Sequence, residues 1–143
     1  MPNIAVLGCG YWGQNLVRNF YQLGALRLVG EIAETGRVKA RQIAPTAEVV
    51  EDFDAVFHRE DIAGVVLATP AETHETLTLR ALEQGKDVFV EKPMALNYVQ
   101  GLRMQESARK NGRVLMVGHL LEYHPAVVKL RELVTAGELG RVN

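Results

Sequence analysis

The stretch IAVLGCGYWGQNLV, residues 4–17, decides the fold, because a glycine loop stands between a strand-like run and a helix-like run. Residues 8–13 within it, GCGYWG, fit the pattern G-x-G-x-x-G. The apolar run before them predicts a short strand, and the apolar spacing over 11–24 predicts a helix. A strand, a glycine loop and a helix in this order are typical of a dinucleotide-binding turn.

Each residue of this loop has a predicted role. Gly8 permits the tight turn, Gly10 lets the backbone approach a pyrophosphate, and Gly13 lets the helix pack on the strand. Backbone N–H groups at the helix start would face the phosphates, aided by the helix dipole. Tyr11 and Trp12 either cover the cofactor or pack at the base of the helix. The alternative for the whole loop is a plain βα turn that binds nothing.

Strands and helices alternate along the rest of the chain. Apolar runs predict further strands at 26–34, 47–50, 64–70, 87–93 and 113–119. Helical spacing predicts helices at 37–44, 52–58, 73–85, 98–110 and 125–137. Strands that are apolar on both faces and alternate with helices indicate a parallel sheet covered by helices on both sides. We therefore predict a doubly wound, mostly parallel α/β fold, a Rossmann-type domain over residues 1–143.

The composition excludes several classes of protein. The net charge is -1, with 16 basic and 17 acidic side chains, so nothing points to a nucleic-acid partner or an anionic membrane surface. No apolar run reaches the roughly 18 residues needed to span a bilayer. Cys9 is the single cysteine, so an intrachain disulfide is excluded. Without a signal-peptide pattern at the N-terminus, a cytoplasmic location is expected.

The end of the second predicted strand bears on the choice of cofactor. A dinucleotide fold usually places an acid there to bind the adenosine ribose. Ala33 stands where that acid is most often found, with Glu31 before it and Glu34 just beyond. Ribose binding by Glu34 would favour NAD, whereas binding of a 2′-phosphate by Arg37 would favour NADP. We predict NAD, with NADP as the alternative; Glu34 as a solvated turn residue is the other interpretation.

Three stretches taken together resemble the Gfo/Idh/MocA family of NAD(P)-dependent oxidoreductases. They are GCGYWG, then ATPAETHETLTLRALEQGKDVFVEKPMAL at 68–96, and VGHLLEYHPAVVKLRELVTAGELG at 117–140. The most specific part is T-P-x-x-x-H followed, about one helix later, by E-K-P. The resemblance covers essentially all of the chain and implies an enzyme acting on sugars, inositols or related polyols.

The resemblance implies roles for matching residues. Thr69 and Pro70 would pass along the nicotinamide half of the cofactor, and His74 would support their loop or serve only as a packing histidine. Glu91 would lie by the nicotinamide ribose. Lys92 would reach the substrate or its reacting hydroxyl, and the bond that follows it, before a proline, is often cis.

A lysine at the mouth of an apolar strand is expected to be partly desolvated. Lys92 could then polarise a carbonyl oxygen or assist proton movement, which makes it the predicted catalytic residue and a substrate ligand. The alternative is a structural pair of Glu91 and Lys92 that closes the strand.

The third stretch narrows the implied substrate. The sequence GHLLEYHP at 118–125 is similar to branches that act on nucleotide-linked amino sugars of the UDP-N-acetylhexosamine type. In that branch Gly118, His119 and Tyr123 lie near the substrate pocket. His124 stands where an asparagine is common. Neither histidine has a cysteine or an acid at metal-ligand spacing, so no metal site is predicted.

The resemblance also implies a second domain, absent from this chain, that supplies most of the substrate pocket and usually the interface of a homo-oligomer. We therefore expect residues 1–143 to bind a dinucleotide but to have little or no dehydrogenase activity alone. Two other functions stay open at this point. One is a stand-alone dinucleotide-binding or redox-sensing module, and the other is a CoA- or nucleotide-binding domain without a redox role.

Overall fold

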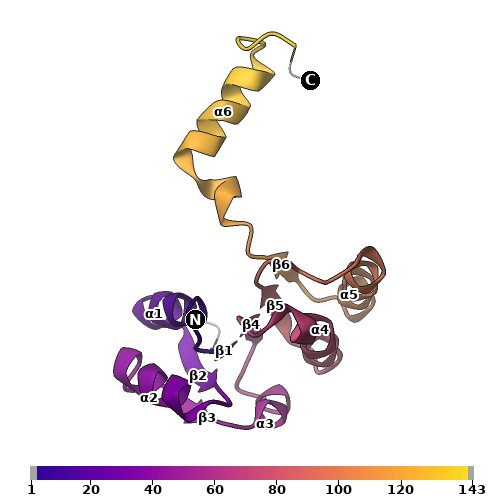
Figure 1. Ribbon diagram of the computed structural model, residues 1–143. Helices are drawn as coiled ribbons and strands as arrows, with labels where there is room; N and C mark the ends of the chain where they lie inside the picture. Colours follow the sequence, from indigo (N-terminus) through magenta and orange to yellow (C-terminus); the bar gives the residue numbers. More distant parts are fainter. Residues whose placement is uncertain (1–2, 142–143) are drawn as a thin grey trace.

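The computed structural model describes residues 3–141 and contains one parallel sheet flanked by helices (Figure 1). The strands are β1 (Ile4–Leu7), β2 (Leu26–Gly30), β3 (Glu48–Val50), β4 (Gly64–Leu67), β5 (Asp87–Val90) and β6 (Leu115–Val117). Their order in the sheet is β3-β2-β1-β4-β5-β6, and every neighbouring pair is parallel. This order, with the chain crossing over between β3 and β4, confirms the predicted doubly wound fold.

Helices cover both faces of the sheet. They are α1 (Gly13–Gln22), α2 (Glu34–Ile43), α3 (Phe53–Phe57), α4 (His74–Glu83), α5 (Tyr98–Asn111) and α6 (Pro125–Thr135), with short 3-10 turns η1 (Ala71–Thr73) and η2 (Leu120–Tyr123). Side chains alternate along β1, so Val6 faces α1 and α2 whereas Ala5 and Leu7 face α3, α4 and α5. Each face has its own cluster of fully buried apolar side chains, so the sheet is apolar on both sides as predicted.

Several strands end earlier than their apolar runs predict. The strand predicted at 26–34 ends at Gly30, and the helix predicted from residue 37 begins at Glu34. The side chain of Glu31 accounts for this, because it accepts a hydrogen bond from the backbone of Ala33 and closes a turn there. The strands predicted to reach residues 70, 93 and 119 likewise end at residues 67, 90 and 117.

One more backbone hydrogen bond continues each of these ladders before the chain leaves the sheet. Ala68 donates to the carbonyl of Leu7 at 2.8 Å, and Glu91 donates to the carbonyl of Leu67 at 3.0 Å. The loops that follow β1, β4, β5 and β6 therefore meet at the carboxyl edge of the sheet, where open α/β sheets bind their ligands.

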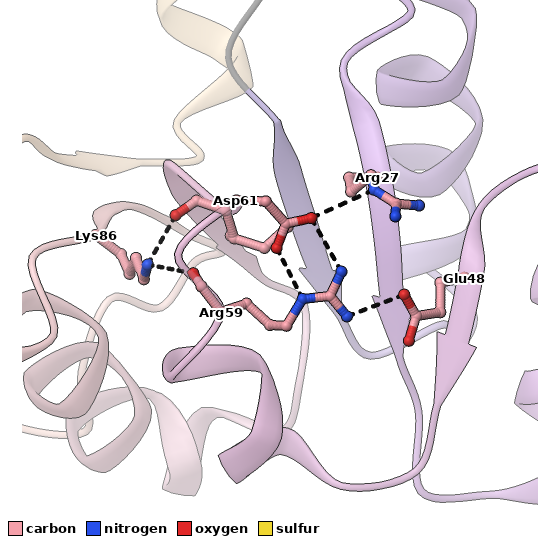
Figure 2. A network of polar contacts seen from close by, with 6 residues as sticks. Arg27, Glu48, Arg59, Asp61 and Lys86 are labelled. Carbon is pink, nitrogen blue, oxygen red and sulfur yellow. Dashed lines mark hydrogen bonds and ion pairs between the residues drawn. The ribbon is translucent and has the colours of Figure 1, made fainter.

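The opposite, amino edge of the sheet carries a network of polar contacts (Figure 2). Lys86 precedes β5 and is buried, and its ammonium donates to the carbonyl oxygens of Arg59 at 2.6 Å and Ile62 at 2.8 Å. The lysine therefore ties the loop before β4 to the turn before β5. Buried lysines need partners of this kind, because an unpaired buried charge is strongly unfavourable.

The guanidinium of Arg59 extends this network to the outer strands (Figure 2). It forms an ion pair with Asp61 at 2.7 Å and with Glu48, the first residue of β3, at 3.0 Å, while Arg27 of β2 lies 3.4 Å from Asp61. The hydrogen bond from Arg59 lowers the pKa of Asp61 to about 2, with a smaller opposing contribution from desolvation. These contacts join the starts of β2, β3 and β4.

Helix α6 extends away from the sheet, above the other helices in Figure 1. It packs mainly against η2, and most of its side chains are exposed. Within residues 3–141, no helix combines the length and the apolar character that crossing a membrane requires.

Candidate functional site

The glycine loop packs tightly against the end of β4. Gly8 has a φ of +93°, and a Cβ atom built there would lie 2.6 Å from the carbonyl oxygen of Ala68. A Cβ atom on Gly13 would lie 2.2 Å from the carbonyl oxygen of Gly8. Both positions therefore require glycine, one for its backbone conformation and its space and the other for space alone. This agrees with the turn and the helix packing that the motif predicts.

Gly10 differs from these two glycines, since a Cβ atom there would meet no protein atom within 4 Å. Around it, the backbone N–H groups of Gly10, Tyr11, Trp12 and Gly13 have no acceptor among residues 3–141. They surround the start of α1, where Trp12 supplies no side-chain cap. Free N–H groups at a helix N-terminus, next to a glycine that leaves space, fit a pyrophosphate.

Glu31 places a carboxylate against this loop. Its Oε2 accepts from the backbone N–H of Cys9 at 2.6 Å, and its Oε1 accepts from that of Ala33 at 2.8 Å. A Cβ atom on Gly36 would lie 2.6 Å from the Cγ atom of Glu31, so the first turn of α2 packs closely on the same side chain. Burial, together with the charge of Glu31, raises the pKa of the Cys9 thiol. The carboxylate is thus fixed between the glycine loop and α2.

Glu34 and Arg37, the two residues expected to decide between NAD and NADP, bind each other at 2.6 Å. Arg37 also donates to the carbonyl oxygens of Glu31 and Ile32 and lies 3.3 Å from Glu51. Its side chain is only 14% exposed. The guanidinium is therefore occupied by protein groups, and Glu31 rather than Glu34 is the acid in contact with the glycine loop.

His74 joins two loops on the other side of the carboxyl edge. The ring is buried, with Nδ1 at 2.8 Å from the carbonyl oxygen of Pro93 and Nε2 at 2.9 Å from that of Thr69. A neutral imidazole donates one hydrogen bond and an imidazolium donates two. In either form the ring lies between the loop that contains Thr69 and Pro70 and the loop that follows β5.

Glu91 and Lys92 differ sharply in their surroundings. Glu91 is 6% exposed, and its carboxylate accepts from the indole N–H of Trp12 at 2.8 Å. Lys92 is exposed rather than partly desolvated as expected, and no ion pair joins it to Glu91 in the described part of the chain. The bond between Lys92 and Pro93 is cis. The structural Glu–Lys pair that the sequence left open is therefore not formed.

A cavity of about 1040 Å³ lies between these loops. It is lined by Tyr11, Trp12, Ala68, Thr69, Glu91, Lys92, Pro93, Gly118, His119, Leu120, Leu121 and Glu122. The structure thus brings residues of the glycine loop, the loop after β4, the E-K-P segment and His119 together around one space. Tyr123 and Pro70 are exposed but are not among the lining residues. Within residues 3–141, no three His, Cys, Asp or Glu side chains gather where they could hold a metal ion.

Sequence reasoning missed the contact between Glu31 and the glycine loop. The contact follows from the strand register, because Gly30 pairs with Leu7 and the residue after β2 must therefore lie beside the loop that begins at Gly8. It also missed the contact between Trp12 and Glu91, which are 79 positions apart, and no local pattern indicates that pairing.

The doubly wound sheet, the free N–H groups at the first helix and the acid fixed beside them define a dinucleotide-binding domain. A family model described as "Oxidoreductase family, NAD-binding Rossmann fold" (GFO_IDH_MocA) matches residues 2–119. The chain belongs to this Gfo/Idh/MocA oxidoreductase family, which confirms the resemblance seen in the sequence.

Relatives in this family carry several activities. The chain is 37% identical over 144 residues to inositol 2-dehydrogenase of Rhodococcus erythropolis, covering 96% of this chain and 41% of that protein. It is 32% identical over 139 residues to 2,7-anhydro-N-acetylneuraminate hydratase of Mediterraneibacter gnavus, covering 96% and 37%. The chain thus spans about two fifths of the length of these relatives.

A solved structure shares the fold. It is a 3-ketoreductase from Actinomadura kijaniata in complex with NADP and TDP-benzene, with a TM-score of 0.85 and 23% sequence identity. The match covers 96% of this chain and 43% of that one.

Proposed function

We propose that this chain is the cofactor-binding domain of an NAD-dependent oxidoreductase that moves hydride between nicotinamide and a hydroxyl or ketone carbon of a sugar, polyol or nucleotide sugar. One observation supports this most: the glycine loop opens on the same cavity as the buried Glu91 and the exposed Lys92. A dinucleotide held by the loop would therefore reach a space where Lys92 can serve the proton of the reacting hydroxyl, as hydride transfer to or from a carbinol needs.

In this proposal, different residues of the carboxyl edge bind different parts of the cofactor. The pyrophosphate would lie against Gly10, where a ligand can approach the backbone, and accept from the N–H groups up to Gly13. The adenosine ribose would donate to the carboxylate of Glu31. The nicotinamide half would pass Thr69 and Pro70 and reach Glu91. When bound, the nicotinamide ring supplies the hydride acceptor or donor.

The environment of Glu31 supports NAD over NADP. A 2′-phosphate on the adenosine ribose would add negative charge beside a fixed carboxylate, which is unfavourable at short range. Arg37, the cation that could compensate, already binds Glu34, Glu51 and two carbonyl oxygens. NADP binding would require these contacts to be exchanged.

The substrate would occupy the outer part of the cavity. Lys92 is exposed there and its ammonium has no partner among residues 3–141, so it is free to hold the reacting oxygen or to assist movement of its proton. His119 lines the same space, whereas Tyr123 would contact substrate only if η2 met it from outside the cavity. The proposal includes a second domain that completes the pocket and a homo-oligomer of the complete protein.

Titration of the chain with NADH and NADPH tests the cofactor assignment. Trp12 is the sole tryptophan and lines the cavity, so its fluorescence reports binding directly. We expect tighter binding of NADH than of NADPH, and a loss of about tenfold in NADH affinity in Glu31→Ala, the size of a lost hydrogen bond to a charged group.

Glu34→Ala is the matched control, because it removes an acid three residues away that does not touch the glycine loop. It should change NADH affinity less than about twofold. Tighter binding of NADPH, abolished by Arg37→Ala, would show instead that the guanidinium leaves its protein partners for a 2′-phosphate. No binding of either nucleotide would contradict the proposed function itself.

A further inference from the structure

The carboxylate of Glu91 contacts its neighbour Lys92 and residues from two distant parts of the sequence. It follows β5, and its Oε1 accepts from the indole N–H of Trp12 at 2.8 Å. Its Oε2 lies 3.3 Å from the backbone nitrogen of Lys92, which is a long contact. Behind it stands Gly118, where a Cβ atom would lie 3.0 Å from the carboxylate carbon and from both oxygens. The carboxylate therefore occupies space that the side chain of any other residue at position 118 would take.

This buried carboxylate has unused capacity to accept hydrogen bonds. An ionised carboxylate offers about four acceptor positions, and Glu91 receives one short bond and one long one. No cation pairs with it within residues 3–141, although it is 6% exposed. A buried acceptor left partly unsatisfied costs free energy that a donor in the adjoining cavity would recover.

Trp12 is well placed to direct that carboxylate. It stands directly before the first residue of α1, in the loop that offers its N–H groups to a ligand, and its indole N–H reaches Glu91 at the end of β5. The ring therefore connects the part of the site proposed for the pyrophosphate with the part proposed for the nicotinamide ribose. Tyr11, its neighbour, is 89% exposed and has no side-chain contact of this kind in the described chain.

We propose that Trp12 is a positioning residue, whose N–H occupies one oxygen of Glu91 and turns the remaining acceptor positions toward ribose hydroxyls in the cavity. Gly118 completes the arrangement, because its lack of a side chain leaves the carboxylate room to hold this position. This inference rests on the proposed function, because the hydroxyls are those of a bound dinucleotide. It gives Trp12 a part in orienting the cofactor, beyond simple packing at the helix base.

The variant Trp12→Phe tests this, because it keeps an aromatic ring and removes the N–H. Affinities are measured by isothermal titration calorimetry for NADH and for ADP, which has the adenosine and pyrophosphate but lacks the nicotinamide ribose. We expect NADH affinity to fall about tenfold and ADP affinity to change less than about twofold. Tyr98→Phe, at an exposed position on α5 that does not line the cavity, should leave both affinities unchanged.

A double-mutant cycle shows whether the effect passes through Glu91. In a Glu91→Ala background, Trp12→Phe should change NADH affinity less than about twofold, because the indole no longer has a carboxylate to direct. The same tenfold loss in both backgrounds would overturn the inference. So would equal losses for NADH and ADP in Trp12→Phe, which would indicate a structural role.

The outcomes also separate this inference from the proposed function. NADH binding that Trp12→Phe leaves intact would overturn the positioning role alone. Wild-type protein that binds neither NADH nor ADP would overturn the proposed function and the positioning role with it. Thermal unfolding of each variant checks that the fold is retained. Gly118→Ala is a second test of the positioning role, because its Cβ atom should displace the carboxylate of Glu91 and so lower the affinity for NADH but not for ADP.

Discussion

Two alanine substitutions in the glycine loop should separate the fold from ligand binding. In Gly13→Ala, the new Cβ atom would lie 2.2 Å from the carbonyl oxygen of Gly8 and 3.1 Å from the Cβ atom of Ala68. Backbone atoms must move to accept it, and such overpacking typically costs about 1–3 kcal/mol. Because the closest atom belongs to the tight turn at Gly8, we expect the free energy of unfolding to fall by about 3 kcal/mol, the upper end of this range.

Gly10→Ala should behave in the opposite way. Its Cβ atom would meet no protein atom within 4 Å, so the free energy of unfolding should change by less than about 1 kcal/mol. The methyl group would, however, enter the space proposed for the pyrophosphate. We therefore expect NADH affinity to fall by about tenfold or more, with the fold unchanged.

Thermal unfolding followed by circular dichroism, with NADH titration by calorimetry, measures both effects. For a chain of 143 residues, a loss of 3 kcal/mol lowers Tm by roughly 10 °C. Gly13→Ala should show that shift, and Gly10→Ala should melt within about 3 °C of wild type. If Gly10→Ala binds NADH as tightly as wild type, the pyrophosphate does not lie against this loop and the reasoning is refuted.

The remaining predictions concern the amino edge of the sheet. Lys86→Met leaves the carbonyl oxygens of Arg59 and Ile62 without their donor. We expect the free energy of unfolding in urea to fall by about 2 kcal/mol, because the loss of two hydrogen bonds from a charged donor outweighs the gain from no longer burying a charge. Lys39→Met, at an exposed position on α2, is the control and should change little; an equal effect would contradict the prediction. The hydrogen bond from Arg59 lowers the pKa of Asp61 from its ordinary 3.8 to about 2, so its contribution to stability is present above pH 4 and is lost as the pH falls toward 2. The difference in unfolding free energy between wild type and Asp61→Asn should therefore shrink over that interval, and a difference that grows on acidification would show that the sign is wrong.

Much of the fold was predictable, because hydrophobic runs and helix-stop residues are local signals. The strand at Gly64–Leu67 is apolar and buried throughout, and the helix at His74–Glu83 has one buried face, as its spacing predicts. The ends of the strands were less predictable. The run through residue 34 is broken at Gly30 by the side-chain contacts of Glu31, which depend on a loop more than 20 residues earlier.

The candidate site was also only partly predictable from the sequence. The glycine loop and the E-K-P segment could be found from the sequence, because each is a short motif at the end of a strand. The partners of Trp12 could not, because its contact with Glu91 exists only once β1 and β5 are placed in one sheet. Likewise, the exposure of Lys92 depends on how far the loop after β5 leaves the sheet, which the apolar run before it does not specify.

The separation of the two edges of the sheet affects how the sequence of this chain can evolve. The amino edge holds Lys86 and Arg59, whereas the groups proposed to meet ligand lie at the carboxyl edge. A strand such as β4, with four residues, separates the edges by about 13 Å, beyond the range at which substitutions usually couple. Mutations that adjust thermal tolerance at the amino edge should therefore accumulate independently of those that adapt the chain to a new substrate. A change in thermal tolerance should therefore need no compensating mutation at the ligand site, and a change of substrate should need none at the amino edge.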